Sequence, residues 1–253
     1  MRRYSDIKND IYIQDIDIYR YSRYIDMLSQ HSHSKMPRII AICGAKRSGK
    51  DVLAEHLVRK YNYERVAFAE PLKHAIKTLF NFDDDQVGIG EDKGTGKKDV
   101  VDERWGITPR AALQFFGTEV MQDKIQDLLP DVKRNFFANT LKNYIKTRMD
   151  ANKEQRFVIS DLRFIHEYEM LFSIPKIRKD DIAIIRVIRP DTSFLRISNP
   201  CDAVAAAAAS STSVASIAHK SEQEYINIPY DIILFNNDTI DAYIEKFDKI
   251  ISV

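Results

Sequence analysis

Residues 38–51 of the chain, RIIAICGAKRSGKD, decide the fold. Their first part, Ile39 to Cys43, is an apolar run with the length of a buried strand. A glycine-rich turn follows at once, and apolar residues then recur at helical spacing at Val52, Leu53, Leu57 and Val58. A strand, a turn that ends in Gly-Lys and a helix form the pattern of a phosphate-binding loop, with the residues Gly44, Ala45, Lys46, Arg47, Ser48, Gly49 and Lys50.

The residue types of this turn suit a polyphosphate. Gly44 and Gly49 allow backbone N–H groups to turn inward around an anion, and the following helix adds its positive N-terminal end. Lys50 is expected to reach the outer phosphates, so the predicted ligand is a nucleoside triphosphate such as ATP. The plainer alternative is a structural glycine turn followed by a solvated lysine.

The position after Lys50 departs from the usual pattern. A Ser or Thr hydroxyl normally binds magnesium there, whereas this chain has Asp51. Carboxylate oxygens are also good Mg²⁺ ligands. We therefore expect Asp51 to take part in holding Mg²⁺, in a different way from a hydroxyl.

Composition limits the classes of protein that the chain can belong to. Its 253 residues suffice for one large domain or one domain with appendages, and a net charge of +1 argues against a nucleic-acid-binding surface. No run of eighteen apolar residues predicts a membrane span, and the N-terminal residues lack the apolar segment of a secretory signal. The two cysteines form no disulfide framework, so we expect a cytoplasmic protein.

The chain divides into an N-terminal extension, residues 1–36, and a domain over residues 37–253. Within the domain, strands and helices alternate as in an α/β fold with a parallel five-stranded sheet and three layers. Strands are predicted at 38–43, 65–69, 156–160, 182–188 and 231–235. Helices are predicted at 50–60, 71–80, 109–122, 131–150, 164–172 and 239–251.

Two segments interrupt this alternation. Residues 83–106 hold five of the eight glycines and many charges, which predicts a flexible loop. Residues 190–221 hold Ala205 to Ala209 and a Ser/Thr tract, which predicts a low-complexity surface insertion. The second segment falls where a lid over the site is expected.

A second group of candidate residues follows the strand at 156–160. Asp161 stands at the carboxyl end of a strand predicted to lie beside the loop strand, where a magnesium-bound water or an acceptor is handled. The alternative role for Asp161 is the N-cap of the next helix. Arg163 is well placed to bind an acceptor phosphate.

Phosphoryl transfer needs positive groups around the phosphate oxygens, and arginine suits them best. The candidates are Arg47, Arg110, Arg163 and Arg189. Arg110 opens a helix after Thr108-Pro109, and Gln114 lies one turn later on the same face, so the pair suits an acceptor phosphate and a base edge. The alternative is a solvated helix face. Arg189 follows the strand at 182–188, at the sheet edge where ligands bind.

At this point the chain resembles the deoxynucleoside monophosphate kinases of phages and large DNA viruses. GAKRSGKD resembles the loop of that family, including its aspartate, and Phe68 to Lys73 resembles its segment after the second strand. The stretch from Thr108 to Glu119 is similar to its acceptor-side helix, and Ser160 to Phe164 to its Asp-x-Arg strand end. The closing part of the family is similar to Val187 to Pro190, to His219, Ser221 and Glu222, and to Ile232 to Asn237.

The resemblance implies a P-loop core, a helical acceptor-binding insertion and a lid. It implies that Gly44 to Asp51 hold the donor phosphates and magnesium, and that Lys50 and Arg47 neutralise charge on the moving γ-phosphoryl. It further implies that Lys73, Arg110 and Arg163 hold the acceptor phosphate, that Gln114 touches its base, and that Asp161 orients a magnesium water or the acceptor.

The implied reaction is transfer from ATP to a deoxynucleoside monophosphate, in the cytoplasm of a host cell or in a viral factory. Expected partners are small nucleotides, with no nucleic acid and no membrane, and a homodimer fits the family. Two alternatives stay open: a kinase for another small acceptor of the dephospho-coenzyme A kind, and a P-loop protein that binds nucleotide without acting as a kinase.

Overall fold

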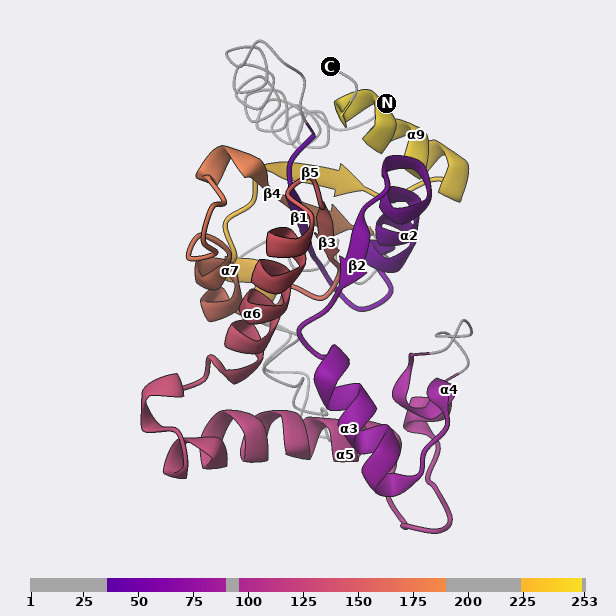
Figure 1. Ribbon diagram of the computed structural model, residues 1–253. Coiled ribbons are helices and arrows are strands. Elements are labelled where there is room, and N and C mark those ends of the chain that lie inside the picture. The colour runs from indigo at the N-terminus through magenta and orange to yellow at the C-terminus, as the bar shows by residue number, and fades with distance from the viewer. Residues whose placement is uncertain (1–35, 90–95, 190–223, 252–253) are drawn as a thin grey trace, which may run out of the picture. The chain divides into compact units, whose positions relative to one another are not determined.

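The computed structural model describes residues 36–89, 96–189 and 224–251 of the chain (Figure 1). The chain forms two compact units. The sheet unit comprises Met1–Arg65, Arg156–Ile165 and Arg178–Val253, and the helical unit comprises Val66–Gln155 and His166–Ile177, in each case as far as these ranges are described.

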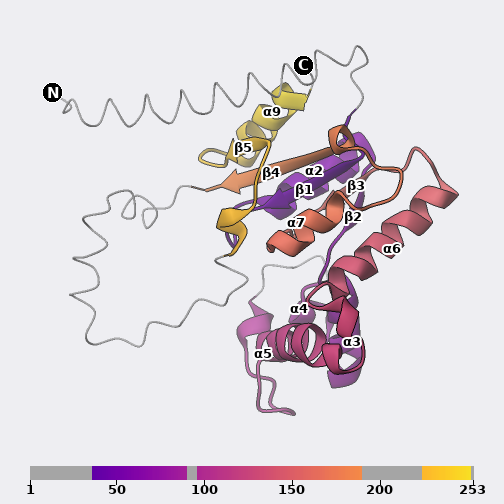
Figure 2. The same cartoon turned by 90° about the vertical axis from the view of Figure 1, so that its left-hand side faces the viewer.

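The sheet unit is built on a five-stranded sheet in the order β2-β3-β1-β4-β5. The strands are β1 (Ile39–Cys43), β2 (Glu64–Val66), β3 (Phe157–Ile159), β4 (Ile182–Ile188) and β5 (Ile232–Phe235). β1 pairs in parallel with β3 and β4, and β4 pairs in parallel with β5, as the turned view of Figure 2 lets the reader follow. β1 is the central strand, and all five of its residues are buried, as expected for a strand covered on both faces.

Helices α2 (Lys50–Tyr61) and α9 (Ile240–Ile251) pack together with this sheet (Figure 1). Leu53 and Leu57 of α2 and Tyr243 and Phe247 of α9 share one buried cluster with alternate residues of β1, β4 and β5. Polar contacts join the two helices as well, because the carboxylate of Asp248 accepts hydrogen bonds from α2. Its donors are His56 Nε2 at 2.7 Å, Lys60 Nζ at 2.7 Å and Tyr61 OH at 2.8 Å.

A partly buried arginine fastens the segment that leads into β5. Arg186 lies within β4, and its Nη2 donates to the backbone carbonyls of Tyr225 at 3.2 Å, Ile226 at 3.0 Å and Ile228 at 2.6 Å. Its guanidinium also lies 4.2 Å from the ring centre of Tyr230. The side chain of Arg186 therefore attaches the short helix η8 (Glu224–Asn227) to β4.

The helical unit contains α3 (Glu70–Phe80), α4 (Asp84–Val87), α5 (Pro109–Gln114), α6 (Phe136–Ala151) and most of α7 (Ile165–Leu171). The segment after α5, η2 (Phe115–Asp123), is a π-helix. Short 3-10 turns are η1 (Lys97–Asp99), η3 (Lys124–Asp127) and η4 (Pro130–Val132). The core of α3, α4 and α5 consists of Ile76, Phe82, Val87 and Ala112, with Phe80 and Phe116 packed against it.

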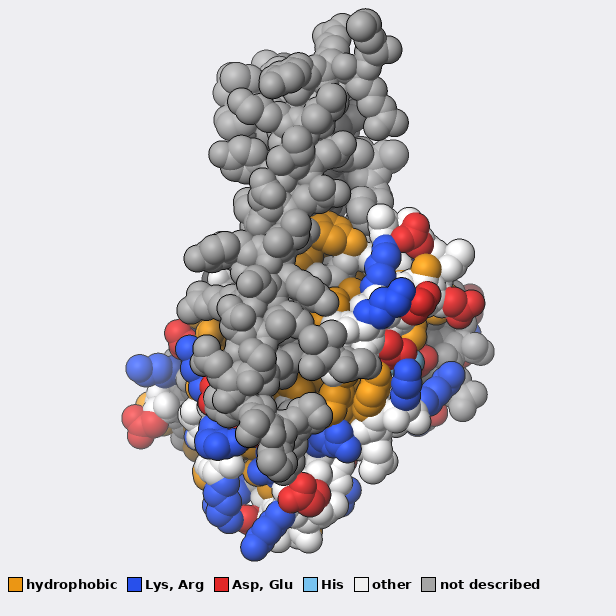
Figure 3. Space-filling view, turned by 90° about the horizontal axis from the view of Figure 1, so that it is seen from above, with side chains coloured by type: hydrophobic (Ala, Val, Ile, Leu, Met, Phe, Trp, Pro, Cys, Tyr) orange, Lys and Arg blue, Asp and Glu red, His pale blue; other side chains and the backbone are white. Residues whose placement is uncertain are grey.

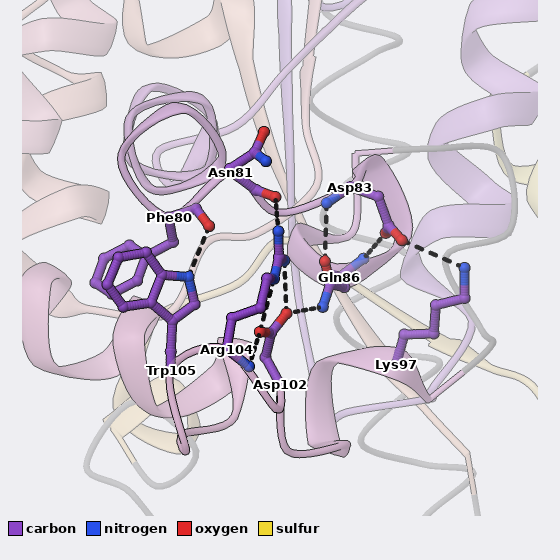
Figure 4. Close-up of polar contacts among 8 residues, drawn as sticks. All are labelled: Phe80, Asn81, Asp83, Gln86, Lys97, Asp102, Arg104 and Trp105. Carbon is purple, nitrogen blue, oxygen red and sulfur yellow. Dashed lines mark hydrogen bonds and ion pairs between the residues drawn. The ribbon is translucent and has the colours of Figure 1, made fainter.

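A polar network orders the segment around residue 102 (Figure 4). The carboxylate of Asp102 is buried and accepts hydrogen bonds from Arg104 Nε at 3.0 Å, Arg104 Nη2 at 2.7 Å and Gln86 Nε2 at 2.9 Å. Arg104 Nη1 donates to the carbonyl of Asn81 at 3.1 Å, and the Trp105 indole donates to that of Phe80 at 2.9 Å. These contacts attach the segment to the end of α3 and to α4.

The predicted α/β class and the five-stranded parallel sheet are confirmed. Four predictions about elements are corrected, the first being the helix expected over 131–150, which begins at Phe136 after the 3-10 turn η4. The strand expected over 65–69 ends at Val66, and the helix expected over 109–122 changes to a π-helix at Phe115, where Gly117 lies so close to Leu72 that a Cβ would contact it at 2.8 Å. The loop expected over 83–106 is partly helical, because α4 and η1 form within it.

Several expectations concern residues outside the described ones. They are the extension predicted over residues 1–36, apart from Met36, the Ala/Ser segment, and the motif of His219, Ser221 and Glu222. Within the described residues, no helix has the length and apolar character needed to cross a membrane.

Candidate active site

The predicted glycine loop connects β1 to α2 and is shaped by contacts with β4 and β5. Gly44 has φ 147° and Gly49 has φ 107°, backbone angles that favour glycine. A Cβ on Gly44 would overlap the carbonyl oxygen of Val187, and one on Gly49 would overlap the side-chain amide of Asn236. Both glycines are thus required by close packing of the loop against the sheet unit itself.

Lys50 lies at the centre of the loop. Its ammonium group donates to the carbonyls of Gly44 at 2.9 Å and Ala45 at 2.5 Å and to the Ser48 hydroxyl at 3.5 Å. Only 8% of Lys50 is exposed, and this burial lowers the pKa of its ammonium group to about 8. A cationic amine surrounded by loop carbonyls is poised to turn toward an anion that enters the loop.

Asp161 and Arg163 act on the same lysine from the end of β3. The positive charge of Arg163 lowers the pKa of Lys50 further, whereas the negative charge of Asp161 raises it. The structure therefore brings these two predicted residues to the neighbourhood of the loop. Helix α7 begins at Ile165, four residues after Asp161, so the alternative role of Asp161 as the N-cap of that helix is excluded.

Asp51, on the first turn of α2, is paired with an arginine that the sequence did not single out. Arg65 Nη2 forms an ion pair with Asp51 Oδ1, and Arg65 Nε donates to the Ser160 hydroxyl at 3.2 Å. Arg65 Nη1 lies 3.7 Å from Glu55 Oε1, one turn further along α2. The Asp51 side chain stays 63% exposed despite this pairing.

Comparisons with known proteins identify relatives of the chain. Residues 38–97 match the family of "Deoxynucleotide monophosphate kinase". The chain is also 31% identical over 217 residues to a protein of Acanthamoeba polyphaga mimivirus named "Putative deoxynucleotide monophosphate kinase", an alignment that covers 85% of this chain and 94% of the relative.

The chain belongs to the deoxynucleotide monophosphate kinase family. Its class of activity is that of a nucleotide kinase. Among solved structures, a dephospho-CoA kinase from Campylobacter jejuni aligns with a TM-score of 0.38 and 13% identity, over 85% of this chain and 98% of that one.

This family member holds its loop with two residues that sequence reasoning missed. Asn236, just after β5, donates from Nδ2 to the carbonyl of Ser48 at 2.9 Å, and Tyr243 of α9 donates to the carbonyl of Gly49 at 3.4 Å. The position of Asn236 at the carboxyl end of a parallel strand was a usable signal, because ligands bind at that edge. Tyr243 and Arg65 have no comparable local signal.

The remaining predicted residues of the kinase lie on described elements away from the loop sequence. Arg189 directly follows β4 and is exposed. In the helical unit, Lys73 of α3 donates to the carbonyl of Gly88 at 3.4 Å, and Arg110 of α5 forms an ion pair with Asp99. The predicted cap of α5 is confirmed, since Thr108 accepts a hydrogen bond from Ala111 N–H at 3.1 Å and Pro109 is the first helical residue. Gln114 ends α5 and is exposed.

The side chains around the loop fit a magnesium ion that arrives with a nucleotide. Within the described residues, no group of three or more His, Cys, Asp or Glu side chains could hold a metal by itself. Magnesium is typically bound by one or two carboxylates together with phosphate oxygens and water. Asp51 and Asp161 supply carboxylates of this kind, and both act on Lys50 through their charge.

Proposed function

We propose that this chain transfers the γ-phosphoryl group of ATP to a deoxynucleoside 5′-monophosphate, giving ADP and a deoxynucleoside diphosphate. The observation that carries the proposal is the buried Lys50 at the centre of a glycine loop in a member of this kinase family. Membership of the family supports a deoxynucleoside monophosphate as the acceptor. The phosphate-binding loop supports ATP as the donor.

In the proposed reaction an oxygen of the acceptor phosphate attacks the γ-phosphorus of ATP. A new P–O bond forms as the bond from the γ-phosphorus to the β–γ bridging oxygen breaks, and the electron pair of that bond leaves with ADP. The attacking oxygen is already anionic, so no strong general base is required. Catalysis then depends on holding the two phosphates in line and on neutralising charge.

We assign the residues of the sheet unit to the donor side. The backbone N–H groups of Gly44 to Lys50 cradle the β- and γ-phosphates, and Lys50 exchanges its loop carbonyls for phosphate oxygens. Arg47, which is exposed with φ 63°, and Arg163 add positive charge around the γ-phosphoryl. Magnesium, held by Asp51 and Asp161 together with the nucleotide, would supply further positive charge to the phosphate oxygens.

On the acceptor side we assign Lys73 and Arg110 of the helical unit to the acceptor phosphate, with Gln114 at the base. In the sheet unit we assign Arg163 and Arg189 as phosphate ligands. The ion pair of Arg110 with Asp99 holds its guanidinium at the start of α5. Arginine is suited to this role because its guanidinium group can donate hydrogen bonds to two oxygens of one phosphate at once.

We propose free nucleotides, not nucleic acids, as the ligands. The net charge of the chain is +1, and on the face drawn in Figure 3 the described Lys and Arg side chains lie among Asp and Glu. A nucleic-acid surface instead gathers positive charge on one face to neutralise the phosphate backbone.

The experiment is a coupled assay of ADP release, with ATP and each of the four deoxynucleoside monophosphates in turn. Turnover with at least one of them is expected, and it should be lost in Lys50→Ala while the protein keeps its thermal unfolding midpoint within a few degrees. Dephospho-coenzyme A belongs in the panel as the alternative acceptor. Release of ADP with none of the deoxynucleotides would overturn the proposal.

A further inference from the structure

Arg65 connects the two places in the sheet unit that carry acidic residues next to the loop. It lies on β2, and its guanidinium contacts α2 through Asp51 and the end of β3 through Ser160. Its side chain is 22% exposed, and its Nη1 atom is buried without a hydrogen-bond acceptor in the described residues. A guanidinium that is this much enclosed and shared among three partners differs from an ordinary surface ion pair, which contributes little to stability.

The contact between Arg65 and Asp51 matters because of the position of Asp51 in the loop sequence. Asp51 follows Lys50, where phosphate loops of the usual pattern place the hydroxyl that binds magnesium. An aspartate side chain is longer than a serine and has two oxygens, so it needs a partner to hold one orientation. Arg65 pairs with Oδ1, and Oδ2 makes no hydrogen bond to the described part of the chain.

The second contact of Arg65 reaches the other candidate carboxylate through the backbone. Ser160, which accepts the hydrogen bond from Arg65 Nε at 3.2 Å, immediately precedes Asp161 and is buried. Ser160 is thereby fixed at the point where β3 ends. One side chain consequently constrains both the start of α2 and the end of β3.

We propose that Arg65 is a positioning residue for the magnesium–nucleotide site, which it serves by orienting the carboxylate of Asp51 and the strand end that carries Asp161. The inference rests on the proposed function insofar as it requires a nucleotide with its metal in the loop. Carboxylates that bind metals are in turn held by hydrogen-bond donors, and loss of such a donor typically weakens metal binding by about 10- to 100-fold. Arg65 supplies that donor to Asp51.

Two other roles for Arg65 predict different effects on metal affinity. If Arg65 only neutralises Asp51 and competes with the metal for it, removal of Arg65 strengthens metal binding. If Arg65 only stabilises the fold, its removal lowers the unfolding temperature and leaves metal binding unchanged. Metal affinity therefore separates the three roles, whereas activity alone does not.

The test uses the full chain, ADP and Mn²⁺ as a spectroscopic probe for magnesium. Titration of Mn²⁺ into the protein–ADP complex, followed by the electron paramagnetic resonance signal of the free ion, gives the metal dissociation constant. We expect Arg65→Ala to raise this constant by about 10- to 100-fold. Binding of ADP in EDTA should change by less than about 2-fold, because Arg65 does not contact the phosphate loop in the described residues. An unchanged or lowered metal dissociation constant would overturn the inference.

Two further variants make the result specific. Arg65→Lys keeps the charge but loses the fork that reaches Asp51 and Ser160 together, so metal affinity should fall here as well. This variant decides the question if Arg65→Ala does not fold. Glu55→Gln is the matched control, since Glu55 contacts Arg65 from the same helix at 3.7 Å and should leave metal affinity unchanged.

The outcomes distinguish this inference from the proposed function. If ADP and Mn²⁺ bind but no deoxynucleotide is phosphorylated, the proposed function falls and the metal titration still decides the role of Arg65. If deoxynucleotides are phosphorylated and Arg65→Ala binds Mn²⁺ as the wild type does, only the inference falls. If ADP binds neither with Mn²⁺ nor in EDTA, and no deoxynucleotide is phosphorylated, both fall.

Discussion

The side-chain amide of Asn236 donates a hydrogen bond to the backbone carbonyl of Ser48 at 2.9 Å, which joins the end of β5 to the middle of the phosphate loop. The same amide occupies the space beside Gly49 that a Cβ would need. The loop therefore owes its shape to a residue 188 positions further along the chain. Loop geometry and the packing of β5 are coupled.

Removal of this amide should weaken nucleotide binding by the loop more than it lowers the stability of the fold. Asn236→Ala deletes one hydrogen bond to a buried part of the backbone, which costs about 1 kcal/mol of unfolding free energy. ADP affinity in EDTA should fall more than this cost suggests, because the loop loses its preorganised shape. Asn237→Ala is the matched control, since Asn237 contacts Lys246 at the surface and not the loop. Equal ADP affinities in the two variants would contradict the coupling.

A second prediction concerns Gly49 itself. Gly49→Ala puts a Cβ into the Asn236 amide at a φ of 107°, so we expect about 1–3 kcal/mol of destabilisation and a loss of ADP binding. Gly106→Ala is the control, because Gly106 also has a positive φ, 66°, but a Cβ there meets nothing within 4 Å. The control should show the backbone strain alone, by chemical denaturation, and keep the binding of ADP. Full ADP affinity in Gly49→Ala would show that the loop does not need this close approach.

The titration of Lys50 predicts how nucleotide binding depends on pH. Burial, then the charge of Arg163, lowers the pKa of Lys50 to about 8, so the amine loses its charge as the pH rises through that value. The affinity for ADP in EDTA should therefore decrease above about pH 8. In Lys50→Met, affinity should be lower throughout and should lack this alkaline decrease; the same decrease in both proteins would contradict the assignment.

The titration of Lys50 should also change the stability of the ligand-free protein. Its free energy of unfolding should rise over the pH range in which the affinity for ADP falls. An unfolded lysine has a pKa of about 10.4, so between about pH 8 and that value the unfolded chain binds more protons than the folded one. The free energy of unfolding should consequently gain a positive contribution as the pH rises through this window. Comparison of wild type with Lys50→Met, by denaturant unfolding at several pH values, isolates it.

Arg163 offers a related test of how the end of β3 acts on the loop. Because its positive charge lowers the pKa of Lys50, Arg163→Ala should move the alkaline decrease in ADP binding to higher pH. It should also weaken binding of the deoxynucleoside monophosphate, measured by calorimetry, if Arg163 holds the acceptor phosphate. Arg59→Ala, at an exposed position in the last turn of α2, is the control that removes a positive charge elsewhere. If the pH midpoint of the decrease in ADP binding is the same in Arg163→Ala as in the wild type, the charge of Arg163 does not lower the pKa of Lys50.

These relationships mark the limit of what the sequence allowed us to predict. β1, the glycine loop and the start of α2 were predictable because strand, turn and helix signals lie side by side in residues 38–51. The cap of α5 at Thr108 was predictable for the same local reason. Tyr243 and Arg65 were missed because each acts through a contact with a segment distant in the chain, which no local pattern encodes. Asn236 was missed although its place at the carboxyl end of a predicted strand was a usable signal.

The segment over 83–106 shows a second reason for error. Its glycines and charges suggested a flexible loop, yet Asp102 is buried and hydrogen-bonded by Arg104 and Gln86. The hydrogen bonds from Arg104 and then Gln86 hold the pKa of Asp102 well below its ordinary value. The many charged residues of this segment suggested that it is exposed to solvent. Asp102 is buried nevertheless, because Arg104 and Gln86 satisfy its carboxylate.

The last prediction concerns Asp248, which joins α9 to α2 through His56, Lys60 and Tyr61. Partial burial raises the pKa of Asp248, but the hydrogen bonds from these three donors outweigh it, so the net pKa lies below its ordinary value. The stability that this carboxylate contributes is present above the unfolded pKa of about 3.9, and it is lost as the pH falls through the lowered folded value. Asp248→Asn should cost about 1–2 kcal/mol near neutral pH by denaturant unfolding, and progressively less as the pH falls below about 3.9 toward the lowered folded pKa. Asp238→Asn, which breaks an exposed pair with Lys246 on the same helix, should cost under about 0.5 kcal/mol. If both variants lose the same stability, or if the cost of Asp248→Asn does not decrease as the pH falls, the carboxylate does not hold the two helices together as the structure indicates.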